Sequence, residues 1–143
     1  MPELSPPPLA PYDAPRRRPG RVLLVDDDDM VRTSMARVLT GAGFDVVAAS
    51  TAGEGLEVLR VDGEVRVVLL DMMMPVQDGW TFRRVQLATP DLSGIPAIVL
   101  TGAPLPMLSH EQLRAADYLL KPVGLEHLIS VVSNYCEPSR IPA

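Results

Sequence analysis

Acidic, hydroxyl and basic side chains stand at the ends of short apolar runs in this 143-residue sequence. Asp26 and Asp27 open a stretch of aspartates directly after the run RVLLV, and Asp71 ends the run VVLLD. Thr101 and Lys121 close two later runs. A carboxylate at the end of a buried strand is costly to desolvate unless a cation compensates it. We therefore expect these side chains to meet at one site.

The chemistry expected of such a site is phosphoryl transfer assisted by a hard cation. Neighbouring carboxylates repel each other, and Mg²⁺ typically binds one or two protein carboxylates together with phosphate oxygens. A carboxylate can attack phosphorus to give an acyl phosphate, which makes Asp71 a candidate nucleophile. The Lys121 ammonium would neutralise the transferring oxygens, and Thr101 would hydrogen-bond one of them. Pro122 follows Lys121, and we expect a cis bond between them, as at some functional tight turns.

Five apolar runs and the segments between them are the elements that must position these residues. Helical spacing of apolar residues is clearest from Val31 to Leu39, from Ala52 to Leu59 and from Leu125 to Val132. Alternating strands and helices need right-handed crossover connections, which predict a mostly parallel sheet covered on both faces. The predicted fold class is α/β, a three-layer doubly wound domain whose ligands bind at the carboxyl ends of its strands. The predicted strands are Val22–Val25, Asp45–Ala48, Val65–Leu70, Ala97–Leu100 and Asp117–Leu120.

Composition restricts the class of protein and its surroundings. With 47% apolar residues the chain can bury a core, and its net charge of −5 gives no reason to expect broad attraction to nucleic acid or anionic lipid. A single cysteine, Cys136, indicates a reducing cytoplasm, and no segment is typical of membrane insertion. We expect a disordered proline-rich leader over 1–20, a folded domain over 21–137 and a tail over 138–143.

The sequence resembles the receiver domain of two-component response regulators, in the CheY-like superfamily. The pieces that carry the resemblance are LLVDDDD, LLDMMMPVQDG, IVLTGA and DYLLKP, in the family's order, with helical stretches between them from Arg21 to Glu137. The resemblance implies a flavodoxin-like five-stranded parallel sheet of order 2-1-3-4-5 with about five helices. It also implies a phosphoacceptor that takes its phosphoryl group from a histidine kinase or a histidine phosphotransfer protein.

The resemblance assigns a role to each site residue. Asp26 and Asp27 would form the acidic pocket, with Asp27 binding magnesium directly and Asp26 through water. Asp71 would be the phosphoacceptor and a metal ligand, and the backbone oxygen of Met73 a further ligand.

Signalling in the family depends on a hydroxyl and an aromatic residue. Thr101 and Lys121 would bind the phosphoryl group, and Tyr118 would be the switch aromatic that moves when the Thr101 hydroxyl is drawn inward. The remodelled surface would contact a downstream protein target, without direct DNA or membrane binding. The chain would then be an enzyme only toward its own phosphorylation and dephosphorylation.

Two prolines depart from the family's pattern, and the sequence allows other interpretations. Pro104 and Pro106 stand where the fourth helix should start and predict a short or displaced helix. A receiver-like binding module that is never phosphorylated is one alternative. A phosphatase with an aspartyl nucleophile is another, although Met73 stands where such enzymes need a second acid. A plainer interpretation of the acidic run makes Asp29 the cap of the first helix.

Overall fold

A five-stranded parallel sheet is the centre of the molecule in the computed structural model, which describes residues 18–72, 78–102 and 107–139. The strand order is β2-β1-β3-β4-β5, as predicted. Each strand lies within one residue of its predicted bounds at either end. The strands are Arg21–Val25 (β1), Asp45–Ala49 (β2), Val65–Asp71 (β3), Ala97–Thr101 (β4) and Asp117–Leu120 (β5).

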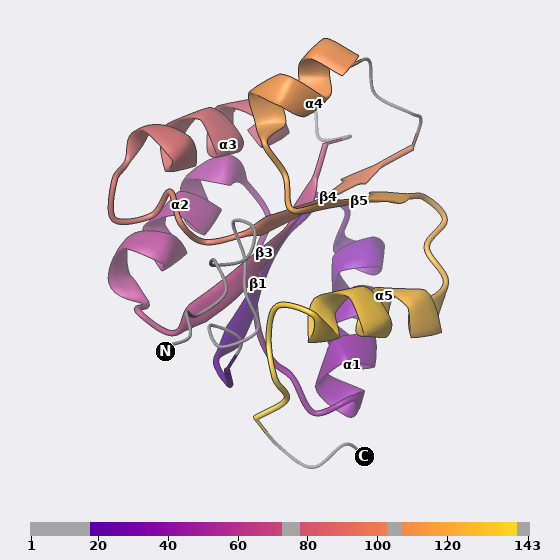
Figure 1. Cartoon of the computed structure of the whole chain (residues 1–143). Helices are drawn as coiled ribbons and strands as arrows, with labels where there is room; N and C mark the ends of the chain where they lie inside the picture. Colours follow the sequence, from indigo (N-terminus) through magenta and orange to yellow (C-terminus); the bar gives the residue numbers. More distant parts are fainter. Residues whose placement is uncertain (1–17, 73–77, 103–106, 140–143) are drawn as a thin grey trace, which may run out of the picture.

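Helices cover both faces of the sheet and make the predicted three layers (Figure 1). One face carries the first and last helices, and the other carries the second and third. The fourth helix has seven residues, which confirms the prediction that it is short. The helices are Asp29–Gly41 (α1), Ala52–Val61 (α2), Asp78–Ala88 (α3), Met107–Leu113 (α4) and Leu125–Ser133 (α5).

The apolar strands bury side chains on both faces. In β1, Val22 and Leu24 belong to the core under α1 and α5, while Leu23 and Val25 belong to the core under α2 and α3. All four are completely buried. Because each such side chain contributes about 1.5–3 kcal/mol when it is buried, the strands are firmly fixed in the sheet. Their carboxyl ends therefore hold the polar residues that follow in constant positions.

Side-chain caps start the first two helices. Asp28, not Asp29, caps α1, since its carboxylate accepts hydrogen bonds from the N–H groups of Met30 and Val31. The interpretation that assigned the cap to Asp29 was wrong by one residue, because Asp28 has the extended backbone of a cap and Asp29 is already helical. Thr51 caps α2 in the same way.

Close helix packing depends on a glycine in α2. A Cβ atom on Gly55 would lie 2.8 Å from the ring of Phe82 and 2.9 Å from a methyl group of Val25. The missing side chain lets α2 approach both β1 and α3.

No helix among the described residues is long and apolar enough to cross a membrane.

Candidate functional site

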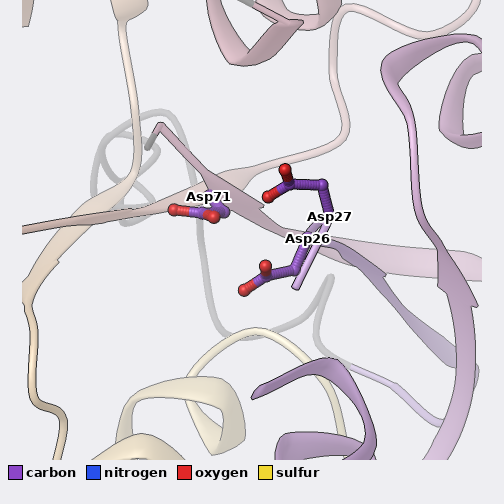
Figure 2. A group of neighbouring side chains, drawn as sticks. All are labelled: Asp26, Asp27 and Asp71. Atoms are coloured by element: carbon purple, nitrogen blue, oxygen red, sulfur yellow. The ribbon is translucent and has the colours of Figure 1, made fainter. Parts of the chain in front are cut away.

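Three carboxylates meet at the carboxyl ends of β1 and β3. These strands are parallel neighbours, with Val25 beside Leu70, so the residues that follow each strand lie at the same edge. One carboxylate oxygen from each of Asp26, Asp27 and Asp71 lies within 4.8 Å of the others (Figure 2). The predicted convergence of these side chains is therefore observed.

Asp26 is the carboxylate that the fold isolates from water. It is completely buried, and its Oδ1 accepts a hydrogen bond of 2.9 Å from the N–H of Asp28. Its Oδ2 has no hydrogen-bond partner among the residues that the structure describes. Burial raises the pKa of Asp26 to about 6, and the nearby charge of Asp71 adds to the rise. Asp27, by contrast, is exposed.

Lys121 supplies the positive charge at this edge of the sheet. Its Nζ lies 3.0 Å from Oδ1 of Asp71 and 4.0 Å from Oδ2 of Asp26. Its backbone N–H donates a hydrogen bond of 2.8 Å to the carbonyl of Thr101, which ties the ends of β4 and β5 together. The bond between Lys121 and Pro122 is cis, as predicted. No other lysine occurs in the chain, so this ammonium is chemically unique apart from the N-terminus.

Thr101 and Tyr118 share one face of the sheet. Thr101 ends β4 beside Leu120, and Tyr118 lies opposite Val99 in the same ladder. Side chains alternate along strands, so Val99, Thr101, Tyr118 and Leu120 all point to the same side. Thr101 is buried, at 5% exposure.

The Tyr118 ring contacts the fourth helix. Its hydroxyl donates a hydrogen bond of 3.2 Å to the carbonyl of His110 in α4. The rings of Tyr118 and His110 stack with their centroids 4.3 Å apart. Tyr118 thus links β5 to α4 on the face of the sheet that Thr101 also occupies.

The donor set fits a hard divalent cation. Three carboxylates lie within reach of one another, and one of them has a buried oxygen that accepts no hydrogen bond from the described residues; these are oxygen ligands of the kind that Mg²⁺ prefers. Met73, the predicted backbone ligand, lies outside the described residues. Which carboxylate binds the ion directly and which through water stays a prediction.

Gly79 is a residue of the site that sequence reasoning missed. A Cβ atom there would lie 2.9 Å from the carbonyl oxygen of Asp71 and 2.7 Å from Sδ of Met72. Only a glycine lets the first turn of α3 approach the end of β3 so closely. The Asp-Gly pair shortly after Asp71 was the signal available in the sequence, although it indicates a turn equally well.

The family model for the response regulator receiver domain matches residues 22–133. The chain belongs to this family. Response regulator MprA of Mycolicibacterium vanbaalenii is 38% identical over 114 residues, which cover 78% of this chain and 48% of that protein. DNA-binding response regulator MtrA of Mycolicibacterium paratuberculosis is 34% identical over 116 residues, covering 78% of this chain and 49% of that protein.

Solved structures of the family have the same fold. Chemotaxis protein CheY4 of Vibrio cholerae superimposes with a TM-score of 0.75 at 25% sequence identity, over 82% of this chain and 98% of that one. The chain spans about half the length of the two curated relatives, whereas the match covers 98% of the CheY4 chain. The similarity therefore concerns a receiver domain of the two-component response regulators.

Proposed function

We propose that the chain accepts a phosphoryl group on Asp71 from a phosphohistidine of a histidine kinase or a histidine phosphotransfer protein. A carboxylate oxygen of Asp71 attacks phosphorus, the P–N bond breaks, and the imidazole nitrogen keeps the electron pair. The observation that carries the proposal is the ion pair of 3.0 Å between Lys121 and Asp71, beside the two carboxylates that follow β1. The product is an acyl phosphate.

Each residue has a separate part in the proposed transfer. Lys121 orients Asp71 and neutralises negative charge on the transferred group. Thr101 donates its hydroxyl to a phosphoryl oxygen, and Asp26, Asp27 and Asp71 hold Mg²⁺. The ion, when bound, supplies charge neutralisation for the phosphoryl oxygens. Apart from phosphorylation and dephosphorylation of Asp71, we propose no enzymatic activity.

The proposed output is a change in packing on the face that carries α4. Once Thr101 turns toward the phosphoryl group, Tyr118 leaves its place against His110 and moves toward the space beside β4. This is a two-state packing change biased by one local charge. Its support is the placement of Thr101 and Tyr118 on one face of adjacent strands.

We propose a cytoplasmic protein whose partners are a kinase or phosphotransfer protein and a downstream protein target. The relatives give no support to the expectation that direct DNA binding is absent, because one of them is a DNA-binding response regulator of twice the matched length. We therefore propose output through contact with a protein and make no proposal about contact with DNA.

The test is incubation of the full chain with acetyl phosphate and Mg²⁺, followed by intact-protein mass spectrometry. We expect one added phosphoryl group that is labile to base and is lost in Asp71→Asn. Asp91→Asn, which changes an exposed carboxylate outside the site, should be labelled like the wild type. Absence of incorporation would favour an unphosphorylated binding module, and turnover of unrelated phosphate esters would favour a phosphatase; either result would contradict the proposal.

A further inference from the structure

A pocket of about 560 Å³ lies at the edge of the sheet opposite Asp71. It opens at the amino ends of β3 and β5 and beside the residues that precede β4. Its size is within the range of roughly 300–1,000 Å³ that small-molecule sites occupy. Four arginines and no aspartate or glutamate line it among the described residues, although the chain as a whole carries a net charge of −5. The arginines are Arg18, Arg66, Arg83 and Arg114.

Arg83 is the buried member of this group. Only 4% of the residue is exposed, and its guanidinium donates hydrogen bonds of 2.7 Å to the carbonyls of Leu113 and Arg114 and to Oε1 of Gln86. All three partners are neutral. In the described part of the chain no carboxylate comes within ion-pair distance of Arg83 or Arg114. Burial and the charge of Arg114 lower the pKa of Arg83 to about 10, as expected for a buried cation with no counter-ion among the described residues.

Among the described residues, only one of the four arginines is paired with an acid. Arg66 pairs with Glu64 at 3.0 Å, and the Glu64 side chain is 59% exposed and does not line the pocket. Arg18 and Arg114 are exposed. The lining therefore keeps an excess of positive charge around one buried guanidinium.

Apart from Ser93, the rest of the pocket wall is mainly apolar and includes Leu87, Ile95 and the ring of Tyr135. We propose that the pocket binds a small organic anion, with a phosphate or carboxylate group paired by the arginines and an apolar body against Leu87 and Ile95. Guanidinium groups match both oxyanions through paired N–H donors. The site shares no residue with the phosphoacceptor site and does not depend on phosphorylation of Asp71.

The test is an NMR titration of the full chain without Mg²⁺, with phenyl phosphate, benzoate and benzyl alcohol at constant ionic strength. We expect saturable shifts at Gly94 and Ala115 for at least one anion, and binding of the neutral alcohol at least tenfold weaker. The relative affinities of phenyl phosphate and benzoate distinguish a phosphate ligand from a carboxylate ligand.

Two pairs of variants localise the binding. Arg114→Asn should weaken it at least tenfold, and asparagine tolerates the φ of 49° at this position. Arg37→Asn in α1 should leave it unchanged. Gly94→Glu should block it and Gly94→Gln should not, since a Cβ there meets no atom within 4 Å.

Three results would overturn the proposal. One is that neither anion saturates at tens of millimolar concentration. Another is that benzyl alcohol binds as well as the anions do, which would indicate an apolar pocket only. The third is that Arg114→Asn and Gly94→Glu both bind like the wild type, which would make the arginines an ordinary solvated surface.

Discussion

Asp26, a residue of the proposed site, lowers the stability of the metal-free protein at neutral pH because its charge is buried. Its carboxylate is buried beside that of Asp71, and its Oδ2 has no hydrogen bond among the described residues. A pKa of about 6, compared with about 3.9 for an aspartate in an unfolded chain, means that the folded state binds this proton more tightly. The stability contributed by the protonated group is therefore lost as pH rises from about 4 to about 6, and it stays lost above that range.

We expect Asp26→Asn to stabilise the metal-free protein at pH 7 by on the order of 2 kcal/mol, because it removes a buried charge while it keeps an acceptor for the N–H of Asp28. The advantage over the wild type should disappear toward pH 4. Urea unfolding in EDTA at several pH values measures it.

Magnesium should reverse this order of stability. The ion should stabilise the wild type, since it binds only the folded state, and should have little effect on Asp26→Asn. Asp27→Asn is the matched control, because Asp27 is exposed: it should weaken the response to Mg²⁺ without stabilising the metal-free protein. A variant Asp26→Asn less stable than the wild type at pH 7 in EDTA would contradict this interpretation of the buried carboxylate.

At the scale of the elements, Arg83 connects α3 to the end of α4. Its guanidinium donates to the carbonyls of Leu113 and Arg114, where α4 ends and the helix dipole is negative. Gln86, also buried, accepts from Arg83 and donates to the carbonyls of Leu92 and Ile95 in the loop before β4. This network holds in place a helix that has only seven residues.

We expect Arg83→Met to destabilise the protein by about 2–4 kcal/mol, because it leaves buried carbonyls and the Gln86 oxygen without donors. Arg84→Met, one position along α3 on the exposed surface, should change the free energy of unfolding by about 0.5 kcal/mol or less. Urea unfolding compares the two variants. Equal effects would show that the network does not stabilise α4.

The Tyr118 side chain connects β5 to α4, and its proposed movement can be followed without knowing the output partner. We expect phosphorylation of the wild type to shift the backbone NMR signals of α4, since Tyr118 leaves its contact with His110. Tyr118→Ala should be phosphorylated as well as the wild type but should lose most of the shift in α4. Tyr118→Phe, which keeps the ring and removes only the hydroxyl bond to His110, should retain most of it. A full response in Tyr118→Ala would remove Tyr118 from the switch.

At the scale of the whole molecule, the arrangement of the sheet could be predicted from sequence because both of its faces are buried. Strands such as β1 and β4 then read as continuous apolar runs, and a polar residue that ends the run marks the carboxyl edge. This pattern predicts that Asp71, Thr101 and Lys121 lie at one site. The strand order itself came from the resemblance to the family.

Features that depend on tertiary contacts could not be predicted. Arg83 and Gln86 bind backbone carbonyl groups. Because every residue has such a group, residue types do not indicate these contacts, and both residues look like ordinary polar residues of a helix. The four aspartates after β1 read alike, yet Asp26 is buried and Asp27 is exposed. The pocket that the four arginines line draws its wall from segments as far apart in the sequence as Arg18 and Tyr135, and only the fold brings these together.

The central claim is that the carboxyl edge of the sheet forms a magnesium-dependent phosphoacceptor site at Asp71. Borohydride reduces an acyl phosphate of aspartate to homoserine, and peptide mass spectrometry then identifies the residue. After treatment with acetyl phosphate we expect homoserine at position 71 when Mg²⁺ is present and not when EDTA replaces it. Homoserine at another aspartate, or equal labelling of Asp71 in EDTA, would contradict the claim.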